Sequence, residues 1–194
     1  MLSDLLSNQE RITLLKLARQ SLELAVNGKQ LPLIELDEYS AKLRENGASF
    51  VTLTIKGNLR GCIGALEPYQ ALVQDVCEHA VAAALQDYRF PPVQPDETSL
   101  LEIEISRLTV PVELVYTSPS DLVDRIRPTV DGVILRDGHL RATFLPQVWE
   151  KLPTAEEFLS NLCHKMGASG DLWARKKIKV FTYQAEEFHE KQYR

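Results

Sequence analysis

Residues 49–66, with the sequence SFVTLTIKGNLRGCIGAL, predict the β-hairpin from which the fold class of this chain follows. Val51, Leu53 and Ile55 alternate with polar residues, which is the two-residue period of a half-buried strand. Residues 56–58, Lys-Gly-Asn, carry the residue types that a tight turn favours. We therefore expect the chain to reverse here and to return as a second strand.

This hairpin begins an element order that occurs twice. A helical stripe follows it, Pro91 and Pro92 end that helix, and a strand with alternating apolar residues comes next. The second copy has an Asp137-Gly138 turn signal and a helix with a capping box that starts at Thr154. The two copies, hairpin, helix and strand, are expected to form two similar halves.

The halves are expected at residues 49–108 and 130–183. An N-terminal helix is predicted over roughly residues 8–27, because Ser7 and Glu10 match a capping box and apolar residues recur at helical spacing. The fold class is therefore α+β, with two similar halves around a mixed or barrel-like sheet in a single domain of residues 1–194. A cleft between such halves is a common binding site for a small-molecule ligand.

The composition excludes several classes of function. With 194 residues and a formal net charge of -5, the chain lacks the basic footprint of a nucleic-acid binder, and the run RKK at 175–177 is interpreted as a solvated face. No apolar run is long enough to span a bilayer, and the N-terminus lacks the basic region of a secretory signal. Three Cys without a C-x-x-C pair indicate a reducing, cytoplasmic location.

The candidate chemistry centres on LRGCIG, residues 59–64. On a regular strand, Leu59, Gly61 and Ile63 share one face, whereas Arg60 and Cys62 share the other with Gly64. Arg60 and Cys62 are then about 7 Å apart at the backbone. A nearby guanidinium lowers the pKa of a thiol, so Cys62 is a candidate nucleophile or redox thiol.

The same residues have a plainer interpretation. A lone Cys is most often a small buried apolar residue. Gly61 and Gly64 allow close approach, either by a ligand or by another part of the backbone. The sequence leaves both alternatives open.

Further charged residues extend the candidate site. Arg89 either forms a clamp for an anionic substrate together with Arg60, or pairs with Asp87 in a local ion pair that braces the end of a helix. Glu104 shares a strand face with Glu102. Such a pair of carboxylates either does acid–base work or binds a metal, or it lies on a solvated face or pairs with the Arg residues. His79, one helical turn after Asp75, is either an oriented base or a histidine at the edge of the core.

No cofactor or metal ion is expected. The sequence has no Walker-type phosphate loop, no G-x-G-x-x-G and no nucleophile elbow. No set of His and Cys residues has the spacing of a zinc site, and Cys77 and Cys163 are interpreted as core residues.

Five sequence blocks resemble the AMMECR domain family. They are FVTLTIKGNLRGCIGAL, AALQDYRFPPV, EIEISRLTVPVEL, VDGVILRDG and RATFLPQVWEKLP, and the resemblance covers roughly residues 11–188. The blocks VDGVIL and TFLPQVWE are similar to the bacterial branch, the AmmeMemoRadiSam system protein A. The resemblance implies an α+β fold with two related halves.

The resemblance also implies a Memo-like protein and a radical-SAM protein as partners. The family's motif positions present here are residues 59–64, Asp87, Arg89 and Phe90, together with Glu104 and Ser106. Some members carry a His where this chain has Asp131, so a role for that His does not transfer.

Two functional hypotheses follow. The first is an accessory or ligand-binding component of the AmmeMemoRadiSam system, in which Gly61 and Gly64 shape a docking surface or a ligand cleft and Cys62 only fills space. The second is an enzyme acting on a small anionic substrate, with Cys62 as nucleophile or redox thiol. In that enzyme, the charge partners are Arg60 and Arg89, and the orienting acids are Asp87 and Glu104.

Overall fold

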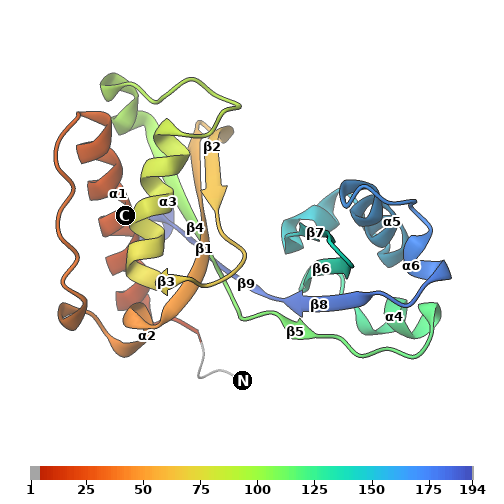
Figure 1. Cartoon of the computed structure of the whole chain (residues 1–194). Helices are drawn as coiled ribbons and strands as arrows, with labels where there is room; N and C mark the ends of the chain where they lie inside the picture. The colour runs from red at the N-terminus through yellow and green to blue at the C-terminus, as the bar shows by residue number, and fades with distance from the viewer. Residues whose placement is uncertain (1–4, 194) are drawn as a thin grey trace. The chain divides into compact units, whose positions relative to one another are not determined.

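The structure, a computed structural model, describes residues 5–193. The chain divides into two compact units, of which unit 1 is Met1–Leu108 with Glu186–Arg194 and unit 2 is Thr109–Ala185. The chain leaves unit 1 once and returns to it at its C-terminal end. Each unit contains its own sheet and helices (Figure 1).

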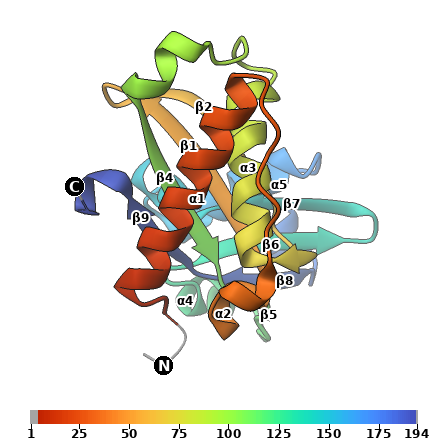
Figure 2. The ribbon, with the colours of Figure 1, turned by 90° about the vertical axis from the view of Figure 1, so that its left-hand side faces the viewer.

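Unit 1 contains a five-stranded sheet of order β2-β1-β4-β9, with the short β3 also paired to β1. Figure 2 shows α1 and α3 side by side on one face of this sheet. Its helices and strands are α1 (Asn8–Val26), η1 (Leu36–Glu38), α2 (Ala41–Arg44), β1 (Asn46–Ile55), β2 (Asn58–Gly64), β3 (Gln70–Ala71), α3 (Leu72–Leu85), η2 (Pro95–Leu100), β4 (Leu101–Leu108), β9 (Ala185–His189) and η4 (Glu190–Tyr193).

The predicted hairpin is present as β1 and β2. The turn consists of two residues, Lys56 and Gly57. Their φ values are 52° and 81°, since a two-residue turn of this kind needs positive φ at both positions. The side chains of Val51 and Leu53 are fully buried, and they lie opposite Ile105 and Ile103 of β4. This face of the sheet forms the core of unit 1 with α1 and α3.

The N-terminal helix begins as its sequence predicts. Ser7 Oγ accepts the N–H of Glu10, and the Glu10 carboxylate accepts the N–H of Ser7. This reciprocal pair satisfies two of the N–H groups that a helix start leaves unpaired. The predicted capping box of α1 is confirmed.

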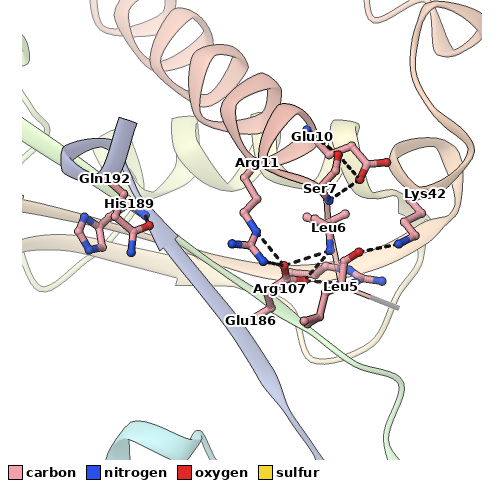
Figure 3. Close-up of polar contacts among 10 residues, drawn as sticks. All are labelled: Leu5, Leu6, Ser7, Glu10, Arg11, Lys42, Arg107, Glu186, His189 and Gln192. Atoms are coloured by element: carbon pink, nitrogen blue, oxygen red, sulfur yellow. Dashed lines mark hydrogen bonds and ion pairs between the residues drawn. The ribbon is translucent and has the colours of Figure 1, made fainter. Parts of the chain in front are cut away.

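A buried carboxylate ties β9 to the N-terminal segment. Glu186 is 9% exposed, and it accepts the N–H of Leu6 at 3.1 Å. Arg11 of α1 and Arg107 of β4 both contact the same carboxylate, at 2.8 and 3.3 Å. Figure 3 shows these groups converging on Glu186 from different elements. A charge this buried is tolerated because it is fully paired.

Unit 2 contains a four-stranded sheet of order β5-β8-β6-β7. In its core, the ring of Trp149 stacks on Phe158 with centroids 3.8 Å apart. Its helices and strands are β5 (Val112–Glu113), α4 (Pro119–Arg125), β6 (Gly132–Asp137), β7 (Leu140–Phe144), η3 (Pro146–Glu150), α5 (Ala155–Lys165), α6 (Leu172–Arg175) and β8 (Lys179–Tyr183).

The second hairpin turns one residue later than predicted. Asp137 still pairs with Leu140 in the ladder, so Gly138 and His139 form the turn. Only Gly138 has a positive φ, of 59°. A turn with Gly at its first central position needs positive φ there alone, which explains the difference from the expected Asp-Gly type.

The repeated element order is confirmed, and the fold class is α+β. In each unit the first strand of the hairpin is central, giving β2-β1-β4 in unit 1 and β7-β6-β8 in unit 2. The expected mixed or barrel-like sheet is replaced by two separate sheets built from antiparallel pairs. The reason is that the third strand of each copy pairs with the first strand of its own hairpin.

Among the helices that the structure describes, none combines the length and the apolar character needed to cross a membrane.

The hydroxyl of Tyr116 binds the backbone of Ile178, the residue just before β8. Its hydroxyl donates to the carbonyl of Ile178 at 3.0 Å and accepts the N–H of the same residue at 2.9 Å, and both residues are buried. Tyr116→Phe leaves both backbone groups without this partner, so we expect unit 2 to lose about 2 kcal/mol of unfolding free energy. Urea denaturation followed by tryptophan fluorescence reports on unit 2, because Trp149 and Trp173 are the chain's two tryptophans.

The matched control is Tyr88→Phe, since Tyr88 is 95% exposed and lies in unit 1. It should leave the transition unchanged. An unchanged midpoint for Tyr116→Phe would show that the hydroxyl does not stabilise this strand.

Candidate functional site

The LRGCIG strand, β2, is not regular. Leu53 of β1 lies opposite Gly61, but the next residue, Thr54, lies opposite Leu59. Arg60 is therefore the extra residue of a β-bulge, which re-aims side chains on the bulged strand. The prediction that Leu59 shares a face with Gly61 was wrong, because the bulge shifts Leu59 to the face that carries Cys62.

Arg60 is held by the segment that precedes β4. Its Nε and Nη2 each lie 2.9 Å from a carboxylate oxygen of Glu97, and its Nη1 donates to the carbonyl of Pro91 at 2.9 Å. This two-point ion pair is largely buried, and it holds the pKa of Glu97 below its ordinary value. The guanidinium of Arg60 thus braces η2.

Glu97 was not identified from the sequence. The signal available was the stretch QPDE at 94–97, because Gln94 is the N-cap of η2, Pro95 follows it, and Glu97 accepts the N–H of Gln94 at 2.8 Å. This pattern locates Glu97 at a helix start. Its pairing with Arg60 depends on the tertiary fold.

Asp87 and Arg89 close the outer edge of β2. The N–H of Cys62 donates to Asp87 Oδ2 at 2.8 Å, and Nη2 of Arg89 donates to the carbonyl of Cys62 at 3.2 Å. Arg89 also pairs with Asp87 at 2.6 and 2.9 Å. Both backbone groups that an edge strand would leave exposed at Cys62 are therefore satisfied by side chains.

Asp87 is 4% exposed and remains ionised. The Arg89 side chain, followed by the N–H groups of Cys62 and Arg89, holds the pKa of the Asp87 carboxyl well below its usual range. A carboxylate with this pKa accepts hydrogen bonds and is poorly suited to take up a proton. The geometry matches the local ion pair considered for these two residues.

The thiol of Cys62 is half-buried and accepts a hydrogen bond. Thr52 Oγ1 lies 3.2 Å from Cys62 Sγ. Burial raises the pKa of the thiol, and the contact with Thr52 and the charge of Arg89 offset this only in part. Cys62 is thus kept as a neutral thiol near pH 7.

Glu104 lies on the same face as Cys62, two strands away. Thr52 is directly opposite Cys62 on one side and Glu104 on the other, so the three residues form a row across β2, β1 and β4. Glu104 also lines a shallow groove of about 180 Å³ with Thr54, His189 and Lys191. Thr52 separates the thiol from the carboxylate by about 10 Å at the backbone.

Gly61 and Gly64 are required by packing inside unit 1. A Cβ on Gly61 would lie 2.1 Å from the carbonyl oxygen of Ala83 on α3, and a Cβ on Gly64 would lie 2.4 Å from Phe50. The space beside both glycines is already filled by the protein itself. Of the two alternatives, close approach by another part of the chain fits Gly61 and Gly64.

His79 belongs to a buried network on the helix-facing side of the sheet. Its Nδ1 lies 3.2 Å from Asp75 Oδ2, which also accepts a hydrogen bond from Ser49 at 2.6 Å. All three side chains are buried, and Ser49 shares its strand face with Val51 of the core. His79 is therefore a histidine tied to a carboxylate within the core.

Asp131, which replaces the His of some family members, is also structural. Its carboxylate pairs with Arg127 at 2.7 Å, and its carbonyl accepts the indole N–H of Trp149. Over residues 5–193, the side chains of His, Cys, Asp and Glu form no group of three that could hold a metal ion.

The raised thiol pKa predicts a slow reaction of Cys62 with alkylating agents. In a Cys77→Ser/Cys163→Ser background, the rate with iodoacetamide should reach half its maximum only above a pH of about 8.5, the ordinary thiol value. Thr52→Val removes the donor that lowers the pKa, so this variant should shift the profile to still higher pH. A half-maximal rate below pH 8 would contradict the neutral-thiol assignment.

The Asp87 contacts predict a stability that depends on pH. Asp87→Asn should reduce the free energy of unfolding by about 2 kcal/mol at neutral pH, since a charge-assisted set of hydrogen bonds is weakened. The folded-state pKa is lower than the unfolded value of about 3.9, so this contribution is fully present above that pH and is lost as the pH falls through the folded value. Denaturation monitored by circular dichroism at several pH values measures the difference.

The control for this variant is Asp96→Asn, because Asp96 is an exposed carboxylate in η2. It should cost little at any pH. A penalty for Asp87→Asn that persists unchanged below pH 3 would show that shape rather than charge is responsible.

Comparisons with known proteins agree on one family. The AMMECR1 family model matches residues 15–188. A protein from Methanothermobacter thermautotrophicus is 42% identical over 95% of this chain and 96% of its own, and one from Thermofilum pendens is 36% identical over 95% and 92%.

The solved structures give the same answer. The crystal structure of an uncharacterised protein from Pyrococcus horikoshii superposes with a TM-score of 0.84 at 32% identity, and the match covers 96% of this chain and 94% of that one. The sequence blocks, the fold and these relatives point to a single conclusion: the chain belongs to the AMMECR1 family.

Proposed function

We propose that this protein is an accessory binding component of the AmmeMemoRadiSam type, which acts in the cytoplasm with a Memo-like protein and a radical-SAM protein. The partners come from the resemblance of the blocks VDGVIL and TFLPQVWE to that branch of the family. The observation that carries the accessory role is the internal pairing of the motif residues. Arg60 pairs with Glu97, and Asp87 pairs with Arg89.

The same pairing argues against the alternative, a Cys-dependent enzyme. A cysteine nucleophile needs a depressed pKa or an adjacent base, whereas burial raises the pKa of Cys62 and its hydrogen-bond partner is the hydroxyl of Thr52. The cations proposed as substrate clamps already bind carboxylates of the protein. The motif therefore favours a rigid surface over a catalytic centre.

That surface presents apolar side chains next to the motif. Tyr88 is 95% exposed, yet its two neighbours, Asp87 and Arg89, are both bound to the backbone of Cys62. Leu59, which the bulge turns away from the core, is 43% exposed. Exposed aromatic residues on a rigid support are typical of protein-binding surfaces, so we propose that a partner docks over Leu59 and Tyr88.

The test is capture of the purified Memo-like and radical-SAM proteins encoded in the same genome. The wild-type chain should retain at least one of them, and Tyr88→Ala should weaken retention about tenfold or more, because truncation of an aromatic anchor typically has an effect of this size. The change removes no contact within unit 1 that would unfold it.

The matched control is Leu33→Ala, since Leu33 is 83% exposed and lies in the connection after α1. It should bind like the wild type. Failure of the wild-type chain to retain either protein would refute the accessory role. Equal retention by Tyr88→Ala would refute the docking surface.

A further inference from the structure

The outer face of the unit 1 sheet, which is the face that carries Cys62, has a graded pattern of side chains. Both long helices of the unit pack on the other face, against Val51 and Leu53. On the outer face, two neighbouring rows each run from a small or apolar residue on β2, through a threonine on β1, to a glutamate on β4. The rows are Cys62, Thr52 and Glu104, and Leu59, Thr54 and Glu102.

These rows are accessible and continue the docking surface proposed over Leu59 and Tyr88. All six side chains of the rows are partly or fully exposed, whereas Val51 and Leu53 on the other face are fully buried. Leu59 belongs both to the docking surface and to the second row. A partner seated on Leu59 therefore lies about 10 Å, or two strand spacings, from the glutamate end of that row.

The glutamate end of the rows has a carboxylate for which the fold supplies no cation. The groove there is lined by the carboxylates of Glu102, Glu104 and Glu190 and by the basic side chains of Lys191 and His189. Lys191 Nζ lies 2.6 Å from Glu102, and Arg19 pairs with Glu190. Within residues 5–193, Glu104 forms no ion pair of this kind.

The charge of Glu104 is felt along its row. Burial, followed by the charges of Asp87 and Glu104, raises the pKa of the Cys62 thiol. Removing a carboxylate from water costs free energy unless a cation or hydrogen-bond donors replace the lost solvation. A partly buried Glu104 without a cation is the arrangement expected where another protein supplies the positive charge.

We propose that the partner that docks over Leu59 and Tyr88 places a basic side chain against Glu104, an inference that rests on the proposed function. An arginine suits this position well, because its planar guanidinium binds a carboxylate at two points. The hydroxyls of Thr52 and Thr54 beside Glu104 are acceptors for the remaining N–H groups. The partner thus needs an apolar contact for Leu59 and a cation about 12 Å away, across two strand spacings and two residues.

The experiment measures binding of the purified Memo-like and radical-SAM proteins to the full chain by titration calorimetry. Glu104→Gln keeps the size of the side chain and removes its charge, so it should weaken binding about tenfold or more. Raising the NaCl concentration from about 50 to about 300 mM should weaken binding of the wild type more than that of the variant, since the variant lacks the ion pair that salt screens.

A second readout uses the wild-type Glu104. In the Cys77→Ser/Cys163→Ser background, a saturating amount of the partner should slow the reaction of Cys62 with iodoacetamide, because Cys62 lies in the same row as Glu104. The matched control is Glu35→Gln, which removes the same charge from an exposed position in the connection after α1. This control should bind like the wild type.

The outcomes separate this inference from the proposed function. If the wild-type chain binds neither protein, the accessory role fails and the contact at Glu104 falls with it. If the wild type binds but Glu104→Gln and Glu35→Gln bind equally well, only the basic contact at Glu104 is overturned. Unchanged reactivity of Cys62 in the complex likewise overturns the seating of the partner across these rows and leaves the accessory role in place.

Discussion

The contact on which the structure of unit 1 depends is the approach of β2 to the C-terminal turns of α3. Gly61 lies so close to the carbonyl of Ala83 that no side chain fits between them. Because α3 ends at Leu85, this approach brings the following residues, Asp87 and Arg89, to the edge of β2. The same strand bulges at Arg60, whose guanidinium then reaches Glu97.

The family motif can therefore be understood as a structural joint. Its glycines permit close packing, its arginine fastens η2, and the backbone of its cysteine receives the Asp87–Arg89 pair. This joint holds Tyr88 exposed on an otherwise immobilised segment. Because the backbone on both sides of Tyr88 is already held, little backbone entropy is lost on binding, which is consistent with recognition of a partner.

The two units share a topology but differ in the chemistry of the face turned away from the helices. Across β2, β1 and β4, unit 1 places the row of Cys62, Thr52 and Glu104. Across the corresponding strands β7, β6 and β8, unit 2 places Arg141, Arg136 and Lys179. A duplicated framework thus supports two different surfaces, since strand alternation leaves the outward residues free of the demands of core packing.

The sequence by itself determined the hairpins, the cap of α1, the repeated element order and the α+β class, because periodicity and capping are local properties of the chain. It also identified Cys62, Asp87 and Arg89 as residues of interest.

Only the tertiary structure decided what they contact. The bulge at Arg60 moved Leu59 to the other face, and the pairing of Arg60 with Glu97 spans 37 positions in the chain. Likewise, the run RKK at 175–177 is exposed as the sequence predicts, but only the alternation around Ile178 places Lys177 and Lys179 along one groove. Register and long-range pairing depend on how separate elements pack, and no local pattern encodes them.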